Sequence, residues 1–210
     1  MVVKVEDLDK LDKRYRANLI NSITGIKPAN LIGTRSRENQ DNLAIFSSVV
    51  HLGSNPAQIG MVTRPQAPNM KDTYSNIMDT GYYTINSIQQ SFIKKAHYTS
   101  SRLDKEVSEF DVMKLKRAVV SDFFAPFVAE SSIKIGLRHL KSLDLPNGCI
   151  FIIGEVLLIE LPNKIMDDEG HMDLSSENVV GISGLNSYYA LEKIASFPYA
   201  KRDKIPEFSA

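Results

Sequence analysis

Apolar and polar residues alternate along much of this chain, which is the pattern of half-buried β-strands. In residues 131–140, Ile133, Ile135 and Leu137 alternate with Lys134 and Arg138. Other apolar or β-rich runs predict strands over residues 29–34, 42–50, 58–63, 82–86 and 149–161. Helices do not alternate regularly with these strands, which disfavours a parallel α/β sheet. The pattern therefore predicts a mainly β fold with helical decorations, an antiparallel barrel of about six strands.

Helical periodicity is confined to a few segments. Apolar residues recur every three to four positions from Leu8 to Ile23, which predicts an amphipathic helix over residues 6–24 that covers the barrel or a partner. Short helices are expected over residues 73–80, ended by Gly81, and over residues 91–96. Residues 104–128 are irregular, with helix or lid character, and the tail 196–210 is expected to be extended. We expect a single domain over residues 1–210.

Composition narrows the functional classes. The chain of 210 residues carries 25 basic and 25 acidic residues, so neither a nucleic-acid surface nor an anionic membrane partner is indicated. The single Cys149 rules out an intrachain disulfide framework. The apolar run that begins there is too short to span a bilayer, which needs about 20 residues. Because the N-terminus is polar and acidic, we expect no signal peptide and a cytoplasmic location.

Several common catalytic motifs are missing from the sequence. No GxGxxG or GxxxxGK[ST] follows a strand, so a Rossmann or P-loop nucleotide site is not supported. There is no GxSxG nucleophile elbow, and no HExxH or other metal-ligand spacing occurs among the four histidines. We therefore predict no metal site and no nucleophilic catalyst.

Small polar groups gather around residues 42–76 and suggest an anion site. Ser47 and Ser48 fall within the predicted strand 42–50, and Lys71, Thr73 and Asn76 fall at the start of the following helix, where Asp72 is the expected N-cap. Helix N-termini attract anions because their first N–H groups lack internal partners. A phosphate between these two places would meet hydroxyls, an amide and a countercharge from Arg64 or Lys71.

The order and spacing of several short motifs resemble one known family. The matching stretches are Asn21-Ser22, residues 28–34, residues 42–48, Arg64-Pro65, Lys71-Asp72-Thr73 with Asn76, residues 96–100, Glu109-Phe110 and Gly154-Glu155-Val156. Together they resemble the flavin reductase-like domain family over residues 14–189. The resemblance implies an FMN-binding split β-barrel, FMN as cofactor, and a homodimer with its cleft at or near the subunit interface.

The resemblance also implies roles for individual residues. Asn42, Leu43 and Ala44 would run along the isoalloxazine and offer it backbone groups, with Thr34 across the hairpin. Ser47, Ser48, Arg64, Lys71, Thr73 and Asn76 would hold the phosphate, and His97 would approach the flavin. Tyr188 would lie on the substrate side.

Three functions stay open at this point. The first is a flavin reductase that takes hydride from NADH or NADPH, and the second is a flavoredoxin-like carrier that exchanges electrons with a protein partner. The third is a non-flavin binding protein on the same barrel.

Overall fold

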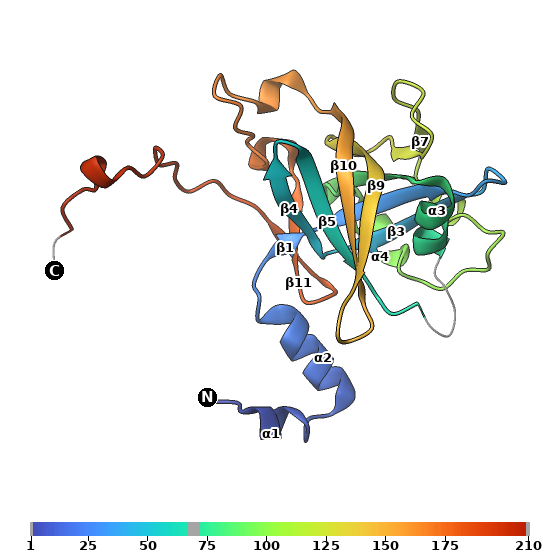
Figure 1. Ribbon diagram of the computed structural model, residues 1–210, viewed down its shortest axis with the longest axis horizontal. Coiled ribbons are helices and arrows are strands. Elements are labelled where there is room, and N and C mark those ends of the chain that lie inside the picture. Colours follow the sequence, from blue (N-terminus) through green and yellow to red (C-terminus); the bar gives the residue numbers. More distant parts are fainter. Residues whose placement is uncertain (1, 67–71, 209–210) are drawn as a thin grey trace.

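The computed structural model describes residues 2–66 and 72–208, and a curved antiparallel sheet of seven strands forms its centre (Figure 1). The strand order is β3-β2-β6-β9-β10-β5-β4. The strands are β2 (Asn30–Arg35), β3 (Asp41–Phe46), β4 (Val49–Ser54), β5 (Ala57–Thr63), β6 (Tyr82–Ser87), β9 (Lys134–Asp144) and β10 (Ile150–Glu160). The mainly β, antiparallel prediction is confirmed, with seven strands in this sheet rather than about six.

Smaller elements surround the central sheet. A second sheet contains β1 (Lys27–Pro28), β11 (Val180–Ser183) and β12 (Ser187–Ala190), and a third contains β7 (Arg117–Ala118) and β8 (Phe127–Val128). The α-helices are α1 (Val5–Leu8), α2 (Lys13–Ser22), α3 (Asp72–Thr80), α4 (Ile93–Tyr98) and α5 (Glu109–Val112). Four 3₁₀ turns are η1 (Gln90–Phe92), η2 (Asn163–Ile165), η3 (Ser175–Glu177) and η4 (Arg202–Lys204).

The prediction of one strand over residues 42–50 is wrong. The chain bends at Ser47, and the segment forms two strands, β3 and β4. β3 pairs with β2 at one edge of the sheet, whereas β4 pairs with β5 at the other. A single bend therefore carries the chain from one edge of the sheet to the opposite edge. β3 and β4 are not paired with each other in the described ranges, so the sheet stays open between them.

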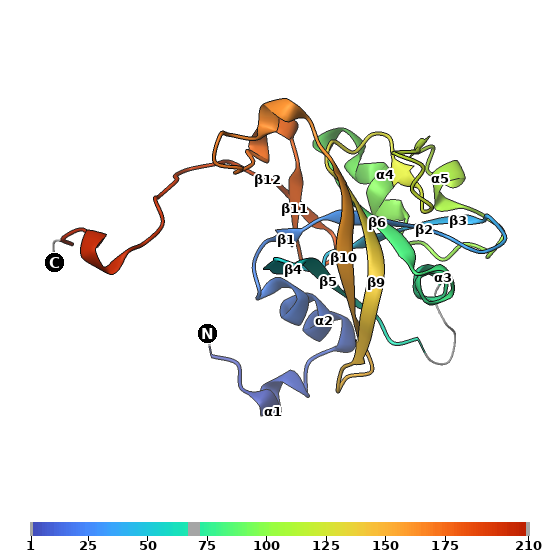
Figure 2. The same ribbon diagram turned by 45° about the horizontal axis from the view of Figure 1, so that its top comes forward.

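Figure 2 shows the long β9–β10 hairpin crossing β2 and β3, so that the sheet curves around its own core. That core contains Ile32, Met61, Tyr83, Leu137 and Ile152, and the α3 residue Ile77 joins it. A second core lies on the other side of β2 and β3, where Leu31 and Leu43 pack with residues of α4, α5 and β11. Alternation sends neighbouring residues of β2 into different cores, which explains why this strand is buried on both faces.

The N-terminal segment differs from the single helix predicted over residues 6–24. Asp12 caps a new helix there, since its carboxylate accepts hydrogen bonds from the backbone N–H groups of Arg14 and Tyr15 at 2.9 and 3.0 Å. The result is two helices, α1 and α2, and no residue of α2 is buried. Beyond β12 the chain runs away from the barrel as an extended tail broken only by η4 (Figure 1).

No helix within residues 2–66 and 72–208 is both long enough and apolar enough to cross a lipid bilayer.

Candidate functional site at the edge of β3

Four of the predicted site residues form one buried hydrogen-bond network at the start of β3. The Asn42 amide donates to the hydroxyl of Thr73 at 2.9 Å and approaches that of Thr34 at 3.4 Å. The Asn76 amide donates to the same Thr34 hydroxyl at 3.1 Å. All four side chains are buried. These contacts attach the first turns of α3 to β2 and β3.

The outer edge of β3 faces away from β2, and no strand of the described residues pairs with it. The N–H of Leu43 points to this edge, because it donates to the Glu109 carboxylate at 2.9 Å. In an antiparallel ladder the residues on either side then turn their N–H groups toward the paired strand. The backbone groups of Asn42 and Ala44 are therefore used in pairing with Thr34 and Ile32 of β2. Of the three residues expected along a flavin, Leu43 presents its N–H outward.

Glu109 is a buried acid at this edge. Burial raises the pKa of its carboxyl above the usual range, the hydrogen bond from Leu43 opposes that shift, and the negative charge of Asp72 adds to it. The expected capping role of Asp72 is not what the structure has, since Asp72 is the first residue of α3 and is exposed. Two acids from different elements thus approach the start of β3.

The segment of residues 106–117, which we call the strap, is pinned along the same edge. The buried Asp41 carboxylate accepts from Arg35 at 2.7 Å and from Arg117 at 2.8 Å. Arg117 also pairs with Asp111 at 2.7 Å and stacks over the Phe110 ring at 4.9 Å. The side chain of Gln40 donates to the backbone oxygen of Glu106 at 3.1 Å. The strap therefore follows β3 closely, and the region predicted to be irregular has a defined position.

Ser47, Ser48 and Arg64 meet at the far end of β3. The backbone oxygen of Ser48 accepts from the N–H of Val62 at 3.0 Å, which brings the bend beside the end of β5 and hence beside Arg64. Among the described residues none forms a side-chain hydrogen bond or ion pair with any of these three side chains, and Ser48 and Arg64 are exposed. Their donors are open to a ligand.

The structure does not bring all the predicted phosphate ligands together. From Asn42 to Ser47 the strand advances five residues, or about 17 Å at roughly 3.4 Å per residue. Thr73 and Asn76 lie with Asn42, whereas Ser47, Ser48 and Arg64 lie at the other end. A single small anion therefore cannot touch both groups. Lys71, the remaining predicted ligand, lies outside the described residues.

His97 belongs to a separate part of the surface. Its Nδ1 lies 3.0 Å from the Tyr188 hydroxyl, and the two rings meet edge to face with centroids 5.8 Å apart. Burial raises the pKa of the Tyr188 hydroxyl to about 12. The pair borders a surface hollow of about 460 Å³ together with Lys94 and Asn186. No hydrogen bond links His97 to the β3 network in the described part of the chain.

Asp41, Arg117 and Glu109 are the residues that sequence reasoning missed as parts of the site. In the sequence Glu109 stands out only as part of the matching pair Glu109-Phe110, to which no role attaches. The available signal was weak: an acid beside an aromatic residue in an irregular segment is ordinary in solvent-exposed loops. Their importance comes from contacts between residues far apart in the sequence. Glu109 and Leu43 are 66 residues apart, and Arg117 and Asp41 are 76 residues apart.

Comparison with known proteins gives consistent results. The family model described as "Flavin reductase like domain" matches residues 26–175. A crystal structure of a candidate flavin reductase with a split barrel domain from Shewanella frigidimarina NCIMB 400 is 44% identical, with a TM-score of 0.91, and covers 95% of this chain and 100% of that one.

Two more distant structures share the fold. Nitrilotriacetate monooxygenase component B from Bacillus cereus is 17% identical with a TM-score of 0.82, over 94% of this chain and 98% of that one. Flavoredoxin of Desulfovibrio vulgaris (Miyazaki F) is 21% identical with a TM-score of 0.72, over 83% and 92%. The split-barrel fold is thereby established, and the family match supports a flavin-binding oxidoreductase. This chain belongs to the flavin reductase-like domain family.

Proposed function

We propose that the protein is an FMN-dependent oxidoreductase that uses NADH or NADPH as hydride donor. Bound flavin would supply the redox chemistry, since it accepts a hydride and passes electrons on. The role of the chain is to bind the cofactor, to orient it and to restrict access to it. The observation that carries the proposal is the pair of exposed side chains Ser48 and Arg64, with Ser47, at the end of an edge strand, where no described residue forms a hydrogen bond or ion pair with these side chains.

The donor set at the end of β3 fits a phosphate. Ser47 and Ser48 offer hydroxyls, and Arg64 offers a guanidinium that can bind two oxygens at once. A doubly charged phosphate needs such a cation, and the position is accessible because Ser48 and Arg64 are exposed. Lys71 remains a predicted contributor. By contrast, Thr34, Asn42, Thr73 and Asn76 would act indirectly, by fixing α3 against the strand.

The ring system fits along the edge toward Leu43. The flavin pyrimidine edge carries both acceptors and donors, which suits the outward main-chain groups of an edge strand beyond Leu43, whose own N–H already donates to Glu109. Ala44 lies between Leu43 and the serines and would contribute surface to the ring. The strap closes the Leu43 end of this edge through Glu109. His97 would approach the flavin from α4, whose first residue Ile93 packs against the core next to β3.

The test begins with the absorption spectrum of the purified protein and an FMN titration. We expect retained FMN, and a loss of at least tenfold in FMN affinity for the Ser47→Ala/Ser48→Ala double variant and for Arg64→Gln, because hydrogen bonds to a charged group contribute about 1.5–3 kcal/mol. Ser54→Ala and Arg14→Gln remove the same groups at exposed positions away from β3. A colourless protein that does not retain FMN overturns the proposal.

The nature of the donor is tested separately. Stopped-flow mixing of the FMN-loaded protein with NADH or NADPH should bleach the visible flavin band. A flavoredoxin-like carrier would stay oxidised with both nucleotides and be reduced only by a redox protein. The strap favours the oxidoreductase that uses NADH or NADPH, because a segment held along the β3 edge can shape a site for a nicotinamide nucleotide.

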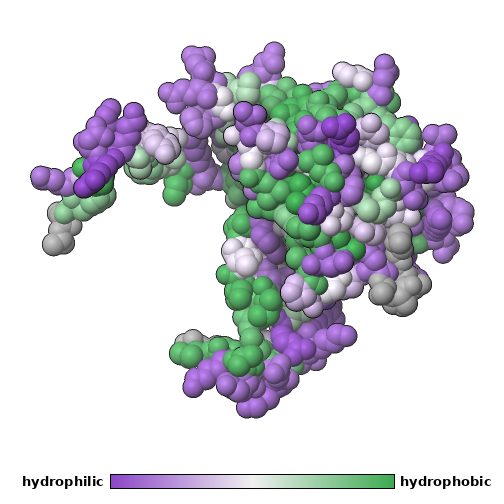
Figure 3. Space-filling model, in the orientation of Figure 1, coloured by the Kyte–Doolittle hydropathy of each residue, from purple (hydrophilic) through white to green (hydrophobic). Residues whose placement is uncertain are grey.

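We further propose that the protein works as a homodimer. Tyr15 and Ile23 of the N-terminal segment are 55% and 65% exposed, and Phe197 and Tyr199 of the tail are 88% and 87% exposed. Figure 3 shows apolar side chains along the N-terminal segment and over the barrel. Apolar surface on this scale is usually covered by a partner. A monomeric mass measured by light scattering at micromolar protein concentration would contradict the proposed homodimer.

A further inference from the structure

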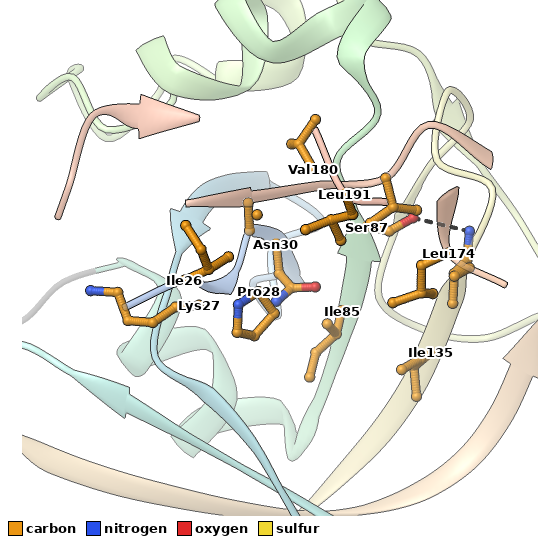
Figure 4. A pocket seen from close by; sticks show the side chains of 14 residues that line it. Ile26, Lys27, Pro28, Asn30, Ile85, Ser87, Ile135, Leu174, Val180 and Leu191 are labelled. Atoms are coloured by element: carbon orange, nitrogen blue, oxygen red, sulfur yellow. Dashed lines mark hydrogen bonds between the residues drawn. The ribbon is translucent and has the colours of Figure 1, made fainter. Parts of the chain in front are cut away.

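A cavity of about 280 Å³ lies where the barrel meets the smaller sheet of β1, β11 and β12 (Figure 4). Its walls come from β1 and the start of β2, from β6 and β9, and from β11. Leu174 and Leu191 complete the walls. We propose that this cavity binds a small, mainly apolar molecule that carries one carbonyl group, and that the side-chain amide of Asn30 recognises this group.

Several of the apolar side chains that form the walls also belong to the hydrophobic cores of the protein. Ile85, Val180 and Ile133 are buried, so this part of the wall is held by packing, whereas Ile26 and Leu174 on the outer side are exposed. Ile85 and Ile135 belong to the barrel core, whereas Val180 belongs to the second core. A space bounded by two cores does not collapse easily, because both would have to shift to fill it.

Asn30 is the polar group of the cavity that lacks a partner. Its side chain is only 8% exposed, and Nδ2 has no hydrogen-bond partner among the described residues. Figure 4 shows the Asn30 amide between Pro28 and Ile85, among the side chains that line the cavity. A buried amide without a partner destabilises the fold, because it has lost its hydrogen bonds to water and gained none in return. A ligand acceptor would relieve that cost.

The other polar side chains around the cavity are already used. The Ser87 hydroxyl oxygen accepts from the N–H of Ile133 at 3.2 Å and is 2.7 Å from the Gln89 amide. The Lys27 ammonium donates to the backbone oxygens of Asn21 and Gly184 at 2.9 and 3.2 Å, away from the cavity. One amide is therefore left to orient a ligand, which predicts a ligand with one polar group.

The volume of the cavity limits the size of the ligand that it can bind. An engineered apolar cavity of about 150 Å³ binds benzene, so 280 Å³ has room for one ring with a short substituent or for a small bicyclic compound. Ligands of this kind are held by apolar contact and oriented by a few polar groups. An aromatic or alicyclic ketone meets both requirements.

This cavity is separate from the proposed flavin site. None of the residues proposed for FMN lines it, and Asn30 faces the barrel interior on the same side of β2 as Ile32. The test can therefore measure binding directly, on the full chain with its flavin content unchanged. Added FMN should not displace the ligand, and displacement would identify the cavity as part of the flavin site and overturn the proposal.

Acetophenone and α-methylstyrene form a matched pair of probes, because they differ in shape very little and only the first has a carbonyl oxygen. Saturation-transfer NMR and calorimetry should show binding of both, with acetophenone at least tenfold tighter. Asn30→Leu replaces the amide by an apolar group of similar size. In this variant the preference for acetophenone should disappear while α-methylstyrene still binds.

A blocking variant locates the site. Leu174→Trp enlarges a side chain at the mouth of the cavity and should abolish binding of both probes. Leu157→Trp makes the same change on an exposed part of β10 outside the cavity and should leave binding unchanged. The proposal is overturned if neither probe binds at millimolar concentration, if both bind equally well to the unaltered chain, or if Leu174→Trp has no effect.

Discussion

The carboxylate of Glu109 accepts a hydrogen bond from the main-chain N–H of Leu43 at 2.9 Å, on the unpaired edge of β3. Burial raises the pKa of this carboxyl above its ordinary value of 4.5, so the folded chain holds the proton more tightly than the unfolded chain does. The free energy of unfolding should therefore fall as the pH rises from the ordinary pKa through the raised one.

Glu109→Gln is expected to remove that fall. The glutamine carbonyl can still accept from Leu43, whereas the buried charge is gone. Denaturant unfolding measured from about pH 4 to pH 8 should give a flatter stability profile for the variant, with the larger gain at the high-pH end. Glu106→Gln changes an exposed acid of the same strap and serves as control. Parallel profiles for the unaltered chain and Glu109→Gln would contradict this prediction.

The network between β3 and α3 predicts a coupled loss of stability. Asn42→Ala leaves the buried Thr73 and Thr34 hydroxyls with fewer partners, and each such loss should cost about 1–3 kcal/mol of unfolding free energy. In a double-mutant cycle, Asn42→Ala and Thr73→Ala should show a coupling of about 0.5–3 kcal/mol. Ser75→Ala, on the more exposed side of α3, should change stability by less than about 0.5 kcal/mol. Strict additivity would show that Asn42 and Thr73 do not act as a unit.

The ion pair between Arg117 and Asp41 predicts how the strap is held. Arg117→Met keeps much of the side-chain stem but removes the charge, so Asp41 retains only Arg35. Hydrogen exchange of residues 106–117 should accelerate clearly, with an overall loss of about 1–3 kcal/mol. Arg138→Met breaks an ion pair on the β9–β10 hairpin and should leave the exchange of the strap unchanged. Unchanged exchange in Arg117→Met would show that the strap is held by other contacts.

Gly154 and Tyr83 give a test of packing inside the barrel. A Cβ at position 154 would lie 2.1 Å from the Tyr83 hydroxyl oxygen, and that buried hydroxyl has no hydrogen-bond partner among the described residues. Gly154→Ala should cost about 1–3 kcal/mol through overpacking.

Tyr83→Phe should by itself be neutral or stabilising, because it removes an unsatisfied group. Added to Gly154→Ala, it should recover much of the lost stability in thermal unfolding. Equal cost of Gly154→Ala in the tyrosine and phenylalanine backgrounds would contradict the proposed clash.

Local pattern was enough to locate most of the elements in the described ranges. The long hairpin of β9 and β10 was readable because alternation and a Pro-Asn-Gly turn lie close together in the chain. Thr73 and Asn76 were correctly expected at the start of a short helix, since a helix start is marked by local sequence. The break at Asp12 was missed, although an aspartate before a basic run is an N-cap signal. The bend at Ser47 was missed because apolar residues stand on both sides of Ser47-Ser48 and resemble one continuous strand.

What the sequence by itself determined is the mainly β architecture, the family, and the residue types able to hold an anion. Tertiary structure alone decided which of those residues are free. Thr73 and Asn76 form hydrogen bonds that hold α3, no described residue bonds the side chains of Ser47, Ser48 and Arg64, and the Glu109 carboxylate accepts from Leu43. The physical reason is range: periodicity is set by neighbours in the chain, whereas a buried donor takes whichever acceptor the whole fold brings within about 3 Å.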